Sequence, residues 1–170
     1  MSTWLSALMD CGTARLDLHA VNEMEAKRIR DCTPQQGDAW AADYPFDGDL
    51  AAIGSFLRAT EQSGEQRPFG HYQIRVRSDG LAVGGVGFKG PPAGDVVEIG
   101  YGLVPSARGH GYAAEAVGQL MQIAAEAGVT TIRADTELDN VASRRTLERA
   151  DFHQVSADAE LYYYEARTIR

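Results

Sequence analysis

The sequence is poor in cysteine and in basic residues, and both shortages limit what the chain can do. Cys11 and Cys32 are its only cysteines and form no CxxC motif, so we expect free thiols rather than a disulfide. Lys and Arg number 16 against 24 Asp and Glu, which gives a net charge of −8. This balance argues against nucleic acid or an anionic membrane as the main partner.

Other absences narrow the choice further. The four histidines, His19, His71, His110 and His153, share no metal-ligand spacing, so no metal site is expected. No apolar run approaches the length of a membrane span, and the start, MSTWLSALMDCG, has no Lys or Arg before Arg15, unlike a signal peptide. We therefore expect a cytoplasmic protein. The motif GxxxxGK[ST] is also absent, which excludes a P-loop.

What remains is the composition of an ordinary globular chain, 44% hydrophobic and 24% charged, whose 170 residues fit one domain, 1–170. Hydrophobic periodicity and turn residues predict the order β-α-α-β-β-β-α-β-α-β-β. The strands are expected at 14–21, 71–76, 81–89, 96–104, 130–135, 152–155 and 161–167. The helices follow the candidate N-caps Asn22, Asp49 and Asn140 and the glycines Gly109 and Gly111. This order predicts an α/β (α+β) fold with a central twisted mixed sheet and one βαβ crossover.

The most informative stretch is VPSARGHGYAAEA, residues 104–116, where glycines follow Arg108 and open a helix. Glycine is costly there unless the backbone adopts a positive φ or approaches a ligand closely. A helix N-terminus offers free N–H groups and the positive end of the helix dipole, so it binds anions. We interpret the stretch as a phosphate-binding loop.

Two ligands compete for this loop. Gly109-x-Gly111-x-x-Ala114 matches the dinucleotide fingerprint GxGxxG/A, and Asp135 follows at the place of a ribose-binding acid. However, residues 105–108 separate the strand from the first glycine, and the chain has too few β-α alternations for a doubly wound sheet.

The second interpretation rests on resemblance. Arg108-x-x-Gly111-x-Ala113 resembles the Q/R-x-x-G-x-G/A signature of the GCN5-related N-acetyltransferases (GNAT). Residues 98–116 together with 139–152 resemble the branch that acetylates the N-termini of ribosomal proteins. The sequence departs from that branch at residues 150–152, Ala-Asp-Phe where Gly-Phe is usual, and at Gly102, where a large aromatic is common. The second departure leaves the substrate class open.

The resemblance implies a GNAT-like single domain that uses acetyl-CoA as co-substrate. It implies that the backbone of Leu103 and Val104 pairs with pantetheine. The pyrophosphate would lie on the loop formed by Arg108, Gly109, His110, Gly111, Tyr112 and Ala113. It also makes Asn140 a cofactor contact, although Asn is equally suited to capping a helix. Ser143 would donate a proton to the departing thiolate or contact the cofactor.

The strand at 96–104 suggests where the chemistry occurs. Alternation places Glu98, Gly100 and Gly102 on one face and Tyr101 on the other, unless a bulge intervenes. Glycines in a strand often mark the close approach of a ligand, so we interpret this face as the floor of a substrate channel, with Glu98 as general base. A carboxylate in a surface ion pair is the simpler alternative. Tyr101 is assigned to packing.

We therefore expect an acetyl-CoA-dependent N-acetyltransferase that moves an acetyl group to a primary amine by direct attack in a ternary complex. The acceptor is a small molecule or a protein N-terminus, and the protein a monomer or homodimer. A non-catalytic acyl-CoA-binding or sensory domain on the same fold is the alternative, and a nicotinamide-dependent oxidoreductase is a more distant one.

Overall fold

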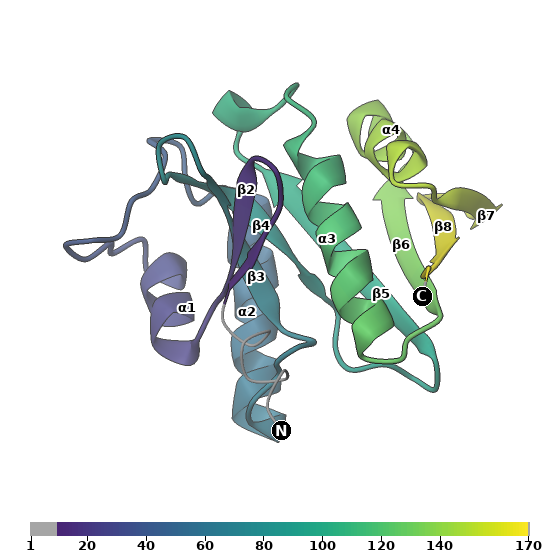
Figure 1. The fold of residues 1–170 in the computed structure, drawn as a ribbon, viewed down its shortest axis with the longest axis horizontal. Helices are drawn as coiled ribbons and strands as arrows, with labels where there is room; N and C mark the ends of the chain where they lie inside the picture. The colour runs from purple at the N-terminus through teal and green to yellow at the C-terminus, as the bar shows by residue number, and fades with distance from the viewer. Residues whose placement is uncertain (1–9, 170) are drawn as a thin grey trace.

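The computed structural model describes residues 10–169. It forms one eight-stranded sheet in the order β1-β2-β3-β4-β5-β6-β8-β7 (Figure 1). The start of the chain, where the sequence indicates no signal peptide, falls mostly on residues 1–9, outside the described residues. Among residues 10–169, no helix is both long enough and apolar enough to cross a membrane.

The order of the elements confirms the predicted fold class. The strands are β1 (Asp10–Gly12), β2 (Leu16–Ala20), β3 (His71–Val76), β4 (Ala82–Phe88), β5 (Val96–Leu103), β6 (Thr131–Glu137), β7 (His153–Ala157) and β8 (Leu161–Arg167). The helices are α1 (Glu23–Arg30), α2 (Asp47–Ser63), α3 (Tyr112–Glu126) and α4 (Val141–Arg149), with a 3-10 turn η2 (Pro105–Ala107). Strand β1 was not predicted, since its three residues are too few to show an alternating pattern.

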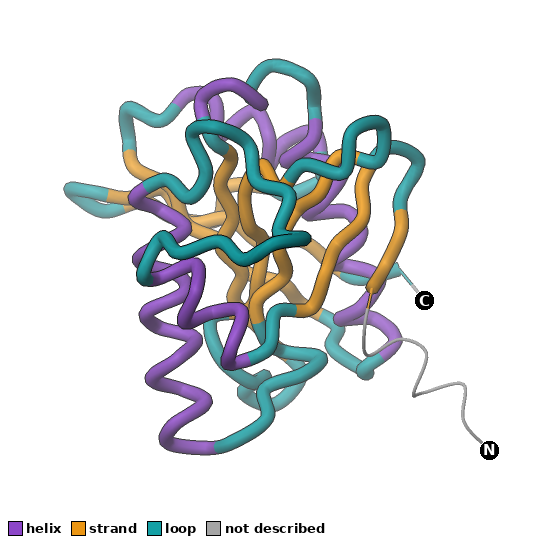
Figure 2. The backbone as a smooth tube through the Cα atoms, turned by 90° about the vertical axis from the view of Figure 1, so that its left-hand side faces the viewer, coloured by secondary structure: helices purple, strands orange, loops and turns teal. Residues whose placement is uncertain are grey.

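The sheet is antiparallel except at its centre. Strands β1 to β5 pair antiparallel, β5 and β6 pair in parallel, and β8 joins β6 to β7 in antiparallel fashion. Helices lie on both sides of it (Figure 2). A Cβ at Gly102 would meet Phe46 at the start of α2, whereas the neighbouring Tyr101 bonds to Ser143 of α4. Because adjacent strand residues point to opposite faces, α2 and α4 cover opposite faces of the sheet.

The predicted N-cap of α1 is confirmed, and the predicted N-cap of α2 is not. Asn22 caps α1 as predicted: its Oδ1 accepts from Glu25 N at 2.9 Å, while Glu25 Oε2 accepts from Asn22 N at 2.9 Å. The assignment of Asp49 as the cap of α2 was wrong, because this helix begins at Asp47. The Asp49 carboxylate instead lies in the first turn, where its Oδ2 accepts from Phe46 N at 3.2 Å.

The core consists of apolar strand and helix residues packed between the sheet and its helices. Its largest fully buried aliphatic side chains are Leu16, Leu18, Ile29, Ile53, Ile74, Ile99, Leu120, Ile132 and Leu147. These residues follow the period of two in strands and of 3.6 in helices, so burial of one face of each element holds the layers together.

Candidate active site

The site begins where two central strands separate. Strands β5 and β6 pair only through Val96–Thr131, Val97–Ile132 and Glu98–Arg133. Beyond these pairs β5 continues to Leu103 beside β4, and β6 continues to Glu137 beside β8. The edge of β5 that faces β6 therefore has no strand partner past Glu98, and such an edge can accept an extended ligand as an added strand.

A cleft of about 1120 Å³ opens at this separation. Its lining comes from residues 99–103 of β5, the loop before α3, one side of α4, and the face of α2 that looks onto the sheet. Because α2 and α4 cover opposite faces, the cleft joins the two sides of the sheet. This geometry gives a cofactor and an acceptor separate approaches to one point.

The glycine loop has the backbone that the sequence predicts. Gly109 and Gly111 have φ values of +83° and +78°, and Gly111 directly precedes α3. Arg108 lines the cleft, donates from Nε to Leu103 O at 3.0 Å, and lies 5.8 Å from the centroid of the Phe46 ring. Of the remaining loop residues, Gly109, Gly111, Tyr112 and Ala113 line the cleft as well.

His110 supports the loop from outside the cleft lining. Its carbonyl accepts from Arg15 Nη1 at 2.8 Å, and its ring stacks on Tyr112 with centroids 5.4 Å apart. Arg15 also pairs with Glu115 at 2.7 Å and lies over the Tyr112 ring at 4.9 Å. Arg15 could not be expected from the sequence, because it is distant from the loop in the chain and no motif marks it.

Three polar side chains converge on the α4 side of the cleft lining. Asn140 Oδ1 caps α4 by accepting from Ser143 N at 3.0 Å, and Ser143 Oγ lies 2.8 Å from the Tyr101 hydroxyl. Tyr101 also donates to Ser143 O at 3.0 Å. Burial raises the pKa of Tyr101 to about 12, so it stays protonated at neutral pH. Tyr101, assigned to packing from the sequence, is thus part of the cleft lining.

Glu98 lies at the start of the separation, in an ion pair. Lys89 Nζ is 2.7 Å from Glu98 Oε1 and 3.0 Å from Asp135 Oδ2. Burial lowers the pKa of Lys89, but its hydrogen bonds to the two carboxylates outweigh burial and the net shift is upward. Lys89 and Asp135 line the cleft, while Glu98 is 43% exposed beside it.

Glu98, Gly100 and Gly102 of β5 share one face, as the alternation of strand residues predicts. Pairing with β4 runs without a shift from Gly84–Leu103 to Phe88–Ile99, and Lys89 N donates to Glu98 O at 2.8 Å. No bulge interrupts these pairs. Glu98, Gly100 and Gly102 therefore share the face that looks toward α2.

The two predicted pantetheine contacts differ in their surroundings. Leu103 lines the cleft. Val104 is fully buried beside it, with its N–H donating to Val83 O at 2.8 Å and its carbonyl accepting from Ala107 N at 3.0 Å. Both backbone groups of Val104 thus have partners within the chain.

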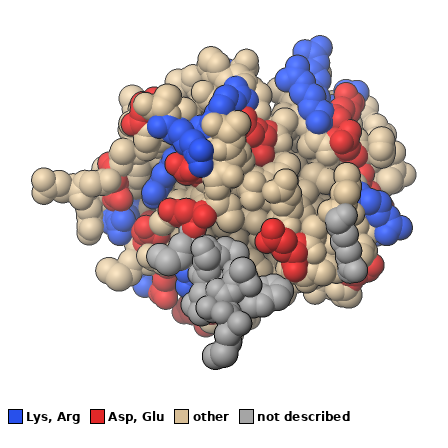
Figure 3. All heavy atoms as spheres, in the orientation of Figure 1, with Lys and Arg blue, Asp and Glu red and all other residues tan. Residues whose placement is uncertain are grey.

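Helix α4 adds positive charge to the cleft. Arg145 and Arg149 line it, and Arg144 lies 4.8 Å from the Tyr162 ring centroid. Basic side chains stand out over α4 in Figure 3, although the chain as a whole is acidic. The arrangement suits an anionic ligand that lies between α4 and the glycine loop.

Comparison with known proteins identifies the family. Residues 15–153 match the acetyltransferase (GNAT) domain. The chain belongs to the GNAT acetyltransferase family. It is 28% identical over 146 residues to the uncharacterized N-acetyltransferase YjdG of Bacillus subtilis, covering 82% of this chain and 87% of YjdG.

Solved structures agree on the fold. An acetyltransferase of Agrobacterium tumefaciens str. C58 superposes with a TM-score of 0.64 at 22% identity, covering 92% of this chain and 93% of that one. RimL, a ribosomal L7/L12 alpha-N-protein acetyltransferase in complex with coenzyme A, gives 0.65 at 16% identity, covering 91% and 95%. The family match confirms the resemblance to the GNAT family, and the solved structures, RimL among them, share its fold. The dinucleotide-binding alternative was wrong: β5 and β6 form the only parallel pair among the described strands, so the glycines do not open a doubly wound sheet.

Proposed function

We propose that this GNAT protein is an acetyl-CoA-dependent N-acetyltransferase that acts on a primary amine. The observation that carries the proposal is the loop with two left-handed glycines at the start of α3, which leads into the separation of β5 and β6. RimL, a relative of the same fold, has been crystallised with coenzyme A. A cleft of about 1120 Å³ has room for such a cofactor and an acceptor together.

The residues present fit the cofactor. Free N–H groups of Gly111, Tyr112 and Ala113 at the start of α3 hold the pyrophosphate, and Arg108 adds positive charge. The unpaired edge of β5 next to Leu103 accepts pantetheine as an added strand. Asn140, which lines the cleft on the opposite side, completes this contact.

Acetyl transfer to an amine requires proton movements that these side chains provide. When bound, acetyl-CoA supplies the thioester whose C–S bond breaks as the C–N bond forms. Glu98 accepts the proton that the ammonium must lose, directly or through one water. Backbone N–H groups on the open edge of β5 would donate hydrogen bonds to the carbonyl oxygen of a bound thioester. Ser143 donates a proton to the departing sulfur and is positioned by the Tyr101 hydroxyl.

The Lys89–Glu98 ion pair favours a second candidate. Lys89 Nζ lies 2.7 Å from Glu98 Oε1 and so occupies the carboxylate that would have to accept the proton of the amine. If the pair persists with both ligands bound, the protein binds acyl-CoA without catalysis and acts as a sensor.

One experiment separates these functions. Melting temperatures are measured with acetyl-CoA, CoA and NAD, and CoA release is then followed with propylamine, spermidine, alaninamide and a tripeptide that begins with serine. At an acetyl-CoA concentration well above its Kd, we expect the melting temperature to rise by several degrees. We also expect at least one amine to be acetylated. Stabilisation without turnover across a broad amine panel supports the sensor, and stabilisation by NAD alone contradicts both candidates.

A further inference from the structure

The α2 side of the cleft contains a patch of sheet without side chains. Gly85 pairs with Gly102, and Gly87 pairs with Gly100, in the antiparallel ladder of β4 and β5. Residues directly opposite each other point to the same face, and alternate residues of a strand share a face. These four residues therefore form one continuous surface facing α2, which we call the glycine floor.

Two buried polar side chains converge above this floor. A Cβ built on Gly85 would lie 2.6 Å from His71 Nε2 and 3.1 Å from Asp49 Oδ1. His71 comes from β3, where it pairs with Gly87, and Asp49 comes from the first turn of α2. Both side chains line the cleft, yet His71 is only 7% exposed and Asp49 only 2%.

Neither group has the partners that such burial normally requires. His71 Nε2 has no hydrogen-bond partner within the described part of the chain. Asp49 accepts one bond, from Phe46 N to Oδ2, and no basic side chain of residues 10–169 pairs with it. An unpaired buried carboxylate costs stability. The hydrogen bond from Phe46 N accounts for the position of Asp49 Oδ2. It does not account for the burial of Oδ1 or for the position of Oδ1 near His71.

Burial sets the protonation states of the pair. It raises the pKa of Asp49 to about 7, with partial opposition from the Phe46 N–H, and it lowers the pKa of His71 to about 4. His71 is therefore neutral at physiological pH, and its imidazole can present one unprotonated nitrogen. Above pH 7 both side chains offer acceptor atoms.

We infer that Asp49 and His71 bind the primary amine of the acceptor above the glycine floor, as positioning residues for the proposed acetyl transfer. Two acceptors aimed at one point require a group with several donors. An ammonium carries three N–H donors, whereas a hydroxyl carries one. The inference rests on the proposed function and specifies its acceptor end.

The surroundings suit an amine attached to a larger molecule. Gly100 leaves the floor open toward Lys89, whose Cε lies 3.4 Å from the Cβ position of that glycine. On the α2 side, Phe46 covers Gly102, and the small residues Gly48, Ala52 and Ser55 line more of the wall. Glu98 pairs with Lys89 at the opposite end of the same face, so the amine enters between two carboxylates.

This arrangement predicts a pH dependence for amine binding. The groups that face Asp49 are His71 from β3 and Tyr44 from the segment before α2, with Lys89 and Glu98 farther along the floor. His71 does not change its charge between pH 6 and 9. The KM for an amine should therefore fall as pH rises through about 7, when Asp49 ionises.

The test compares Asp49→Asn with Asp47→Asn, which removes the same charge from an exposed position in the same helical turn. His71→Phe removes Nε2 while keeping a ring. Steady-state kinetics use the best amine of the panel above and its N-methyl derivative. Thermal shifts use propylammonium, with propanol as the uncharged control, in the presence of CoA.

We expect Asp49→Asn to raise the KM for the amine roughly 10–100-fold and to abolish its pH dependence, with a smaller change in kcat and none in CoA affinity. His71→Phe should raise KM and reduce the preference for the primary over the N-methyl amine. Asp47→Asn should match the wild type. Stabilisation of wild type and Asp49→Asn by propylammonium to the same extent, or an unchanged KM, would overturn the inference and leave acetyl transfer intact. If no amine is acetylated, the proposed function fails first, and the propylammonium shift still decides whether the pair binds amines.

Discussion

The two ends of the cleft differ in whether backbone groups or side chains provide their polar contacts. At the cofactor end the contacts come from backbone: the glycines at 109 and 111, the first N–H groups of α3, and the unpaired edge of β5. At the acceptor end the backbone is the glycine floor, and the polar contacts come from two buried side chains, Asp49 and His71.

This difference has a physical consequence. A site made of backbone amides binds the phosphate groups of the cofactor. Its affinity for phosphate depends little on which side chains surround it. A site made of buried side chains can be altered by single substitutions without disturbing the cofactor. We therefore expect the acceptor end to set the specificity of this chain, and the burial of Asp49 and His71 to lower its stability.

The largest effect should come from Glu98, which lies beside the cleft where β5 and β6 begin to separate. Glu98→Gln retains size but cannot accept a proton, so we expect kcat to fall roughly 10²–10⁴-fold while CoA affinity is unchanged. The loss should shrink at high pH, where more of the free amine is already deprotonated. Glu165→Gln, in an ion pair 2.7 Å from Arg133 on a neighbouring strand, is the matched control. Full activity of Glu98→Gln would show that a group at the acceptor end, and not Glu98, accepts the proton of the amine.

A single glycine substitution should weaken CoA binding at the cofactor end. Gly111→Val places a β-branched residue at φ +78° beside the phosphate site, so it should weaken CoA binding at least 10-fold and cost about 1–3 kcal/mol of stability. Gly128→Val imposes the same strain at φ +86°, after the other end of α3. Calorimetric titration with CoA should separate them. Equal CoA affinity in both variants would mean that the loop does not bind the phosphate.

The fold was predictable because its signals are local. Alternating strands, the Asn22 cap and the glycines before α3 each act within a few residues, and each is present as expected. The start of α2 was misplaced because its N-cap is Phe46, a residue type that does not signal a cap, while Asp49 accepts from Phe46 N from within the first turn.

Within the cleft, only the backbone geometry of the glycine loop was predictable, for the same reason, and its cofactor role stays a prediction. The loop is contiguous, so its glycines and Arg108 form a motif. Asp49, His71 and Arg15 meet their partners through packing of distant segments, which no local pattern encodes. One signal was available: Asp49 lies four residues before Ile53, on the buried face of α2.

The cost of the acceptor end should be measurable without any substrate. The pKa of Asp49 is about 7 in the folded chain against 3.8 as the ordinary value. The folded state thus retains a proton that the unfolded state has lost, so stability falls as pH rises from about 4 to 7 and stays reduced above. Asp49→Asn should therefore melt roughly 3–8 °C above the wild type at pH 8, with the difference vanishing near pH 4. A lower Tm at pH 8 would show that Asp49 serves only as a cap.

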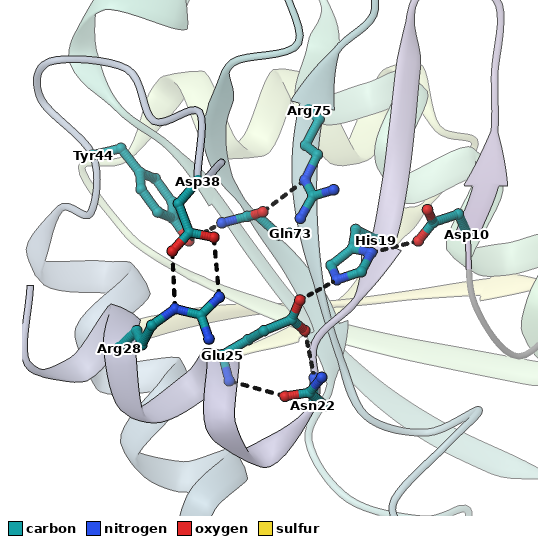
Figure 4. Close-up of polar contacts among 9 residues, drawn as sticks. All are labelled: Asp10, His19, Asn22, Glu25, Arg28, Asp38, Tyr44, Gln73 and Arg75. Atoms are coloured by element: carbon teal, nitrogen blue, oxygen red, sulfur yellow. Dashed lines mark hydrogen bonds and ion pairs between the residues drawn. The ribbon is translucent and has the colours of Figure 1, made fainter. Parts of the chain in front are cut away.

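The smallest effect belongs to the polar network around His19 and Gln73, which lies beside the acceptor end on the same face of the sheet. Figure 4 shows His19 between Asp10 and Glu25, with Gln73 linking Arg75 to Tyr44 nearby. The hydrogen bond to Glu25, 2.8 Å from Nε2, is the main cause that raises the pKa of His19, against partial desolvation.

Because the folded pKa of His19 exceeds the unfolded one, its contribution is complete below about pH 6.5 and is lost as pH rises through the folded value. His19→Gln should therefore cost about 1 kcal/mol at pH 5.5 and almost nothing at pH 9, as measured by urea unfolding. Kinetics should not change, since His19 does not line the cleft. A rise in the KM for the amine in this variant would extend the acceptor end into the network, which reaches the segment before Asp49 through the Gln73–Tyr44 and Arg28–Asp38 hydrogen bonds.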